Sequence, residues 1–214
     1  MAAYRYPDAG LAVLAKAPVP GLAKTRLIPA LGPEGAARLH AELLRRTVSR
    51  LLAARLGPLW LFCHPDIDHP EFAALAAHGA QLETQLGADL GERMATAARR
   101  VLERTRYAIL LGTDIPELDP GYVEAAIRAL RAGRDAVLGP AEDGGYCLLG
   151  LRRCEDALFS NMAWSTAEVA AETRRRLGGL GWDWQELPAR WDVDEPEDVL
   201  RYHAWSGGRT ADEA

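Results

Sequence analysis

The sequence predicts a single α/β domain with a mostly parallel central sheet and helices on both faces. Short apolar runs alternate along the chain with longer segments of helical periodicity, as in parallel strands joined by crossover helices. The length of 214 residues suits one such domain. No internal repeat, low-complexity linker or change in composition divides the chain. We therefore expect one domain over residues 1–205 and a frayed tail over residues 206–214.

Composition and charge argue against several classes of protein. Apolar residues make up 49% of the chain and charged residues 26%, which is typical of globular proteins. The net charge of −5 argues against a general nucleic-acid-binding surface. The N-terminus shows no secretory signal, no apolar run approaches the ~20 residues of a membrane span, and the cysteines form no disulfide or zinc pattern. We expect a cytoplasmic protein with reduced thiols.

The first half of the chain contains four of the expected strands. The apolar run 10–15 is a buried strand that ends at Lys16 and Pro18. A long helix follows from Pro33 to about residue 56, since proline suits its first turn and leucines recur at helical spacing. Strands and helices then alternate over the segments 59–63, 69–78, 80–85, 91–105 and 107–111.

Three more strands are expected in the second half. Segments 135–139 and 146–151 flank the turn sequence PAEDGG, and 184–187 is the last strand. Ligands of such sheets gather at the carboxyl ends of the strands. Polar residues and glycine are frequent in the segments that follow strands, which are KAPVPGLAKTR, GTD, GPAEDGG and DVD. We therefore expect these four segments to meet at one edge of the sheet.

Helix caps are also visible in the second half. Asp119 is expected to cap the helix that follows it. Ser165 and Glu168 form the S-x-x-E pattern of a capping box for a helix that ends near residue 177. Asp194 and Glu197 are expected to cap the final helix.

The segment KAPVPGLAKTRL after the first strand is the strongest candidate for binding phosphates. It supplies three cations, a flexible glycine and a hydroxyl, which are Lys16, Lys24, Arg26, Gly21 and Thr25. Such cations form charge-assisted hydrogen bonds to a di- or triphosphate. The alternative is a solvated basic loop, but its place after the first strand and its shape-fixing prolines favour phosphate binding. A P-loop is excluded, because Ala23 stands where that motif has glycine.

Aspartates follow other expected strands. Asp114, after the strand 107–111, is placed to hold Mg²⁺ or Mn²⁺ against phosphate oxygens, with a turn aspartate as the alternative. Asp192 and Asp194 form a D-x-D in which both side chains share one face of an extended segment. Because Asp194 is also a candidate helix cap, we favour Asp192 as the second metal ligand. Asp143, in E-D-G-G-Y, either contacts substrate or belongs to a plain hairpin turn.

Covalent and histidine-based metal chemistry lack supporting patterns. No metal-binding spacing occurs among the histidines, most of which we expect at surface or helix positions: His40, His64, His69, His78 and His203. The chain has no nucleophile elbow, and no cysteine carries the flanking signals of a nucleophile. Trp164 beside Ser165 and Thr166 either packs in the core or lines an acceptor pocket.

The chain resembles a bacterial family of GT-A-fold, glycosyltransferase-like proteins, some of them linked to arsenosugar gene clusters. The resemblance covers about residues 11–200 and rests on an ordered set of segments: KAPVPGLAKTRL, GADLGERM, GTDIP, GPAEDGGYCLLGL, WST and DVDEPEDV. The first segment also resembles that of 2-phospholactate guanylyltransferase and, more distantly, molybdenum-cofactor guanylyltransferase. The implied fold is the nucleotide-diphospho-sugar transferase fold, a Rossmann-like mixed sheet with flanking helices. The resemblance implies that Lys16, Lys24 and Arg26 lie on the nucleotide-phosphate loop. It also implies that Asp114 and Asp192 occupy the two metal-ligand positions.

These residues leave more than one function open. In nucleotidyl transfer, a nucleoside triphosphate reacts with a small phosphorylated or anionic acceptor and releases pyrophosphate, with Lys24, Asp114 and Asp143 in the catalytic set. In glycosyl transfer, which the family resemblance favours, a nucleotide-diphospho-sugar donates its sugar to a small acceptor. A non-catalytic nucleotide-binding protein is the third alternative. We favour metal-dependent nucleotidyl transfer, because three cations suit a triphosphate, and we leave base, acceptor and oligomeric state open.

Overall fold

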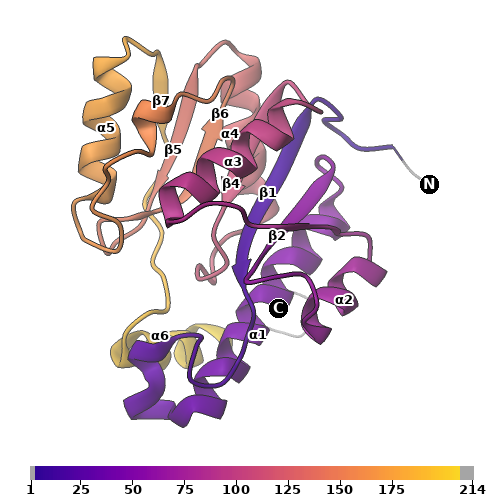
Figure 1. Cartoon of the computed structure of the whole chain (residues 1–214), viewed down its shortest axis with the longest axis vertical. Coiled ribbons are helices and arrows are strands. Elements are labelled where there is room, and N and C mark those ends of the chain that lie inside the picture. Colours follow the sequence, from indigo (N-terminus) through magenta and orange to yellow (C-terminus); the bar gives the residue numbers. More distant parts are fainter. Residues whose placement is uncertain (1–2, 208–214) are drawn as a thin grey trace.

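Residues 3–207 are described by a computed structural model, shown in Figure 1. They form a seven-stranded sheet with the strand order β3-β2-β1-β4-β6-β5-β7. The strands are β1 Ala9–Lys16, β2 Leu59–His64, β3 Gln81–Thr84, β4 Tyr107–Leu111, β5 Ala136–Pro140, β6 Tyr146–Leu151 and β7 Trp184–Glu186. Neighbouring strands are parallel except at β6, which is antiparallel to both β4 and β5. The predicted mostly parallel α/β sheet is confirmed.

Helices cover both faces of this sheet. Those that do so are α1 Ile28–Ala54, α2 Pro70–Ala77, α3 Leu90–Leu102, α4 Pro120–Arg131 and α5 Val169–Gly179, whereas α6 Pro196–Gly207 packs against α1 in a separate apolar cluster. Apolar side chains of α1, α2 and α4 pack in one core, and those of α3 and α5 pack in a second core on the opposite face. Figure 1 shows α3 lying across the strands. None of the helices in the described part of the chain is long and apolar enough to cross a membrane.

Strand β1 is continuously apolar because both of its faces are buried. Leu11 and Val13 are fully buried in the core beneath α1, while Ala12 between them is buried in the core beneath α3. Successive side chains of a strand point to opposite faces, so a strand covered on both sides needs apolar residues throughout. Burying each leucine or valine contributes about 1.5–3 kcal/mol before entropy costs. This burial fixes the strand whose carboxyl end carries Lys16.

The first long helix begins before its predicted start. α1 starts at Ile28, and Gly32, with a φ of 69°, breaks its first turns from the remainder. Pro33 then begins the long regular part, as proline does in a helical first turn. The glycine is needed because a positive φ is unfavourable for residues with a Cβ atom.

One predicted cap is confirmed and two are wrong. Asp119 accepts a hydrogen bond from the backbone N–H of Tyr122 at 2.9 Å. The capping box at Ser165 and Glu168 does not form. Ser165 has a φ of 63°, and α5 begins only at residue 169 without a side-chain cap. A tertiary bond replaces it, because the backbone N–H of Ala170 donates to the carbonyl of Gly144 at 2.8 Å.

The final helix is also capped differently from the prediction. The Asp198 carboxylate accepts hydrogen bonds from the backbone N–H groups of Asp194 at 3.1 Å and Glu195 at 2.8 Å. The Asp194 side chain instead binds Arg26. α6 continues to Gly207, which lies within the predicted tail, and the rest of that tail, residues 208–214, lies outside the described residues.

Candidate active site

A cleft of about 730 Å³ opens at the carboxyl ends of the strands. Residues of all four predicted segments line it, so these segments do meet at one edge of the sheet. The predicted site residues among its walls are Lys16, Lys24, Thr25, Arg26, Asp114, Asp143 and Asp192. Gly21 does not line the cleft, and its φ of 81° shapes the loop beside it.

Lys24 links three of the loops around the cleft. Its ammonium lies 2.8 Å from Asp114 Oδ1 and 3.6 Å from Asp194 Oδ1, and it donates a hydrogen bond to the Val193 carbonyl at 2.6 Å. The side chain is only 4% exposed. Its backbone is left-handed, with a φ of 48°, which is uncommon for a residue other than glycine. Several interactions therefore hold this lysine in place at once.

Arg26 is also paired with carboxylates. It donates to Asp194 Oδ2 at 2.5 Å and lies 3.5 Å from Glu195 Oε1. Arg26 and Thr25 are both exposed at the rim. Two of the three cations predicted to bind phosphate thus meet carboxylates in the free protein. A phosphate group that binds either of them must compete with those carboxylates.

Asp114 lies between Lys24 and a histidine. Burial tends to raise the pKa of its carboxyl group, but the nearby Lys24 ammonium and His40 outweigh burial and lower it below its usual value. His40 Nδ1 is 3.8 Å from Asp114 Oδ1, and its Nε2 lies 2.9 Å from the Lys16 carbonyl. Because a carbonyl only accepts, Nε2 carries hydrogen, and Nδ1 is left facing the carboxylate.

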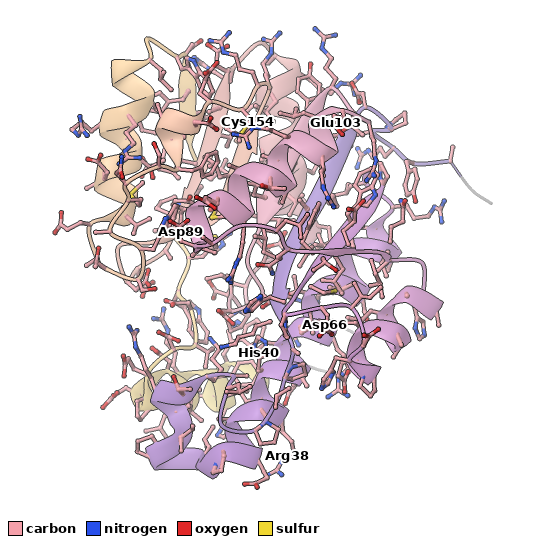
Figure 2. The ribbon with its side chains drawn as sticks, in the orientation of Figure 1. Arg38, His40, Asp66, Asp89, Glu103 and Cys154 are labelled. Carbon is pink, nitrogen blue, oxygen red and sulfur yellow. The ribbon has the colours of Figure 1, made fainter. Side chains whose placement is uncertain are left out.

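His40 is a site residue that the sequence did not reveal. It lies on α1, as Figure 2 shows, and is buried. Its neighbours are the end of β1 and the loop after β4, which are distant in sequence. No local spacing could have indicated this contact.

A second acidic group, Asp192, lines the cleft next to Val193, whose carbonyl accepts the hydrogen bond from Lys24. Burial and the nearby charges of Asp143 and Asp194 raise the pKa of Asp192 to about 6, although Lys24 partly offsets them. Asp143 Oδ1 also accepts a hydrogen bond from the backbone N–H of Gly145 at 2.8 Å. Asp143 is therefore a turn residue that also lines the cleft. Both roles that the sequence suggested for it are compatible with its position.

The cleft is also lined by two residues, Gln85 and Arg93, for which the sequence predicted no role in a site. Gln85 follows β3, and its amide nitrogen donates to the carbonyls of Ala15 at 3.1 Å and Phe62 at 2.8 Å. Since both partners are acceptors, the orientation of the Gln85 amide is fixed. Arg93, from the GADLGERM segment, lies in the first turns of α3, and its Nε donates to the Gly87 carbonyl at 3.1 Å.

The WST segment forms another part of the wall. Trp164, Ser165 and Thr166 all line the cleft, as expected if Trp164 borders an acceptor pocket. The Trp164 ring meets Tyr146 edge-on, with centroids 6.4 Å apart. A Cβ atom at Gly91 would lie 2.7 Å from Trp164 Nε1, so glycine allows α3 to approach this ring. The segment joins α3 to the far side of the cleft.

Comparison with known proteins places the chain in a family. Residues 47–166 match the DUF2064 family, described as an uncharacterized protein conserved in bacteria. The chain belongs to this family. The DUF2064 protein is also 34% identical over 203 residues to a phosphoenolpyruvate guanylyltransferase of Rubrobacter xylanophilus, across 92% of this chain and 96% of that relative. The predicted relationship to guanylyltransferases is confirmed.

Solved structures agree with this placement. A protein of Desulfovibrio desulfuricans G20, assigned to the nucleotide-diphospho-sugar transferases, aligns with a TM-score of 0.81 and 32% identity over 92% of this chain and 87% of its own. A cytidylyltransferase of Leptospira borgpetersenii aligns with a TM-score of 0.65 at 12% identity, which shows the fold alone. The GT-A fold is confirmed, and the DUF2064 protein is a nucleotide-dependent transferase.

Proposed function

We propose that this protein is a metal-dependent nucleotidyltransferase that joins the nucleoside monophosphate of a triphosphate to a small phosphorylated acid. The observation that carries the proposal is the position of Lys24, whose ammonium meets Asp114 and the Asp192–Asp194 segment inside one cleft. The guanylyltransferase relative supports GTP as the donor and an acid like phosphoenolpyruvate as the acceptor. Residues 3–207 act as one domain in this proposal.

The proposed reaction needs positioning more than acid–base chemistry. A phosphate oxygen of the acceptor attacks the α-phosphorus of the triphosphate, and the bond from that phosphorus to the oxygen bridging the β-phosphorus breaks. The electron pair leaves with pyrophosphate. Because the acceptor is already an anion, no general base is required. Lys24 would stabilise the negative charge that collects on the leaving group.

The carboxylates of the cleft suit a divalent cation. Asp114 and Asp192 would hold Mg²⁺ or Mn²⁺, since both line the cleft and offer the oxygen ligands that these ions prefer. A bound ion would neutralise charge on the phosphate oxygens. Crowding of Asp192 by Asp143 leaves negative charge that a cation would compensate. Nucleotide binding then requires Lys24 to exchange Asp114 for a phosphate oxygen.

Glycosyl transfer is the second candidate function. It is favoured by the 32% identity to a protein assigned to the nucleotide-diphospho-sugar transferases. In this reaction the cleft would bind a diphosphate, and exposed Asp143 would contact the sugar or the acceptor. The two reactions share a nucleotide site but differ in the bond broken and in the leaving group.

A product assay separates these functions. The purified protein is incubated with Mg²⁺, each common nucleoside triphosphate and a panel of phosphorylated acids that includes phosphoenolpyruvate, and pyrophosphate is measured. A parallel series uses UDP- and GDP-sugars and measures free nucleoside diphosphate. We expect pyrophosphate only when triphosphate and acceptor are both present. Release of nucleoside diphosphate without pyrophosphate would favour glycosyl transfer, and nucleotide-dependent thermal stabilisation without either product would contradict both reactions.

A further inference from the structure

The cations of the cleft fall into two groups. Lys24 and Arg26 are paired with carboxylates, as described above. Lys16 and Arg93 also line the cleft, but neither has a carboxylate partner within 4.0 Å among residues 3–207. In a chain with a net charge of −5, most of the other arginines among residues 3–207 pair with an aspartate or a glutamate. Because Lys16 and Arg93 have no carboxylate partner in the part of the chain that the structure describes, their positive charges are available to attract an anion into the cleft.

The backbone brings these cations together. Lys16 is the last residue of β1 and pairs in parallel register with His64, the last residue of β2. Side chains at paired positions of parallel strands lie on the same face of the sheet. Arg93 lines the same cleft from the first turns of α3. Its Nε bond to the Gly87 carbonyl restrains the guanidinium and leaves the terminal nitrogens available for a ligand.

His64 shows that the three groups interact. Burial lowers the pKa of its imidazole, and the charges of Arg93 and Lys16 lower it further, while Asp66 acts weakly in the opposite direction. The imidazole is therefore neutral near neutral pH, and it can donate one hydrogen bond without adding positive charge. A dianion bound here would reverse the local field and raise the pKa of His64.

We propose that Lys16, His64 and Arg93 form an anion-binding site for a phosphate group, distinct from the paired cations Lys24 and Arg26. The assignment of this phosphate to a substrate rests on the proposed function. Its source is either the β- and γ-phosphates of the triphosphate or the phosphate of the acceptor. The site lies at the ends of β1 and β2, while Asp143 lines the cleft from the turn between β5 and β6, and Trp164 lines it from the segment after β6. The guanidinium of Arg93 would bind two oxygens of this phosphate at once.

Binding measurements test this site without catalysis. Isothermal titration with inorganic pyrophosphate, GTP, GMP and phosphoenolpyruvate compares the wild type with Lys16→Gln, Arg93→Gln and Arg93→Lys. Lys16→Gln removes a charge whose side chain has no ion pair in the described part of the chain, so the fold is expected to remain intact. Arg38→Gln is the matched control, because Arg38 is exposed on α1 and lies away from the cleft (Figure 2).

Each glutamine variant is expected to weaken pyrophosphate binding about tenfold or more, and Arg93→Lys to recover part of the loss. Weaker GTP and pyrophosphate binding with unchanged phosphoenolpyruvate binding assigns the site to the nucleotide. The reverse result assigns it to the acceptor. Unchanged affinity for every ligand in both glutamine variants would overturn the proposal.

Titration of His64 by NMR gives an independent readout. We expect added pyrophosphate to raise the pKa of His64 in the wild type and to have a smaller effect in Arg93→Gln. An unchanged His64 titration at saturating pyrophosphate would contradict the site. If the protein releases no pyrophosphate in the product assay but still binds it through Arg93, the proposed function fails and this site stands. If pyrophosphate is released in the product assay but both glutamine variants bind pyrophosphate as tightly as the wild type, the proposed function stands and this site fails.

Discussion

The ammonium of Lys24 lies 2.8 Å from Asp114 Oδ1, which joins the phosphate loop after β1 to the acidic loop after β4. Strand order explains this contact, since β1 and β4 are neighbours in the sheet. The same ammonium donates to the Val193 carbonyl at 2.6 Å. The free protein therefore keeps its main cation and a proposed metal ligand paired with each other.

Replacing Lys24 with methionine should separate its two roles. Lys24→Met removes a phosphate ligand, so GTP affinity should fall about tenfold or more. It also frees the Asp114 carboxylate from a competing cation, so Mn²⁺ should bind the nucleotide-free variant more tightly. Calorimetry measures the first effect, and electron paramagnetic resonance of unbound Mn²⁺ measures the second. Arg38→Met is the control, and unchanged affinity for both ligands would show that Lys24 only links the loops.

Asp114→Asn should remove most of the metal-dependent turnover. An amide is a weaker ligand than a carboxylate and carries no charge to hold the cation, so we expect a loss of about a hundredfold or more. Pyrophosphate release is measured as a function of Mg²⁺ concentration. Asp156→Asn is the control, since Asp156 is exposed and pairs with Arg99 outside the cleft. Turnover of Asp114→Asn that still rises with Mg²⁺ would contradict the role of Asp114.

The pKa of Asp192 predicts a pH-dependent effect on stability. Its folded-state pKa of about 6 lies above the model-compound value of 3.8, so its favourable contribution is lost as pH rises through about 6. Without metal, Asp192→Asn should therefore stabilise the protein at alkaline pH by about 1–2 kcal/mol, after allowance for solvent screening, and by less in acid. Urea unfolding at both pH values measures this difference. An equal effect at both would contradict the elevated pKa.

Gly144 should tolerate no side chain in the turn that carries Asp143. Its φ is 88°, and a Cβ atom would lie 2.1 Å from the Ala167 carbonyl oxygen. Gly144→Ala should therefore cost about 1–3 kcal/mol and displace the turn from the WST segment. Gly145→Ala is the matched control, because its Cβ would meet only the Asp143 side chain, at 3.1 Å. Urea unfolding compares the two variants, and equal losses would contradict the steric explanation.

Most of the fold could be predicted from local patterns. Each of the seven expected segments contains a strand. The inner strands β1, β2, β4 and β6 are apolar on both faces, which made them recognisable, whereas the edge strands β3 and β7 are partly exposed. The meeting of four loops at one edge followed from the parallel sheet. Local patterns failed where a tertiary bond competed with a local one. The Ser165 capping box is lost because Gly144, across the cleft wall, supplies the acceptor for α5.

The site could be predicted only in part. Charged residues after strands predicted a site with Lys24, Asp114 and Asp192, and all three line the cleft. The pairing of Lys24 with Asp114 was not visible, because sequence reveals which charges are present and not which ones neutralise each other. His40 and Arg93 were missed for a related reason. Each lies on a helix, and its role depends on which loop that helix faces.

The most direct test of the proposed reaction uses GTP radiolabelled at the α-phosphate with phosphoenolpyruvate and Mg²⁺. Nucleotidyl transfer predicts that the label moves to a new nucleotide-linked acid and that unlabelled pyrophosphate appears in equal amount. Asp114→Asn should abolish both products, and Asp156→Asn should retain them. If the label stays in GTP with every phosphorylated acid tested, while a sugar nucleotide releases its nucleoside diphosphate, nucleotidyl transfer is contradicted and glycosyl transfer is the reaction of this cleft.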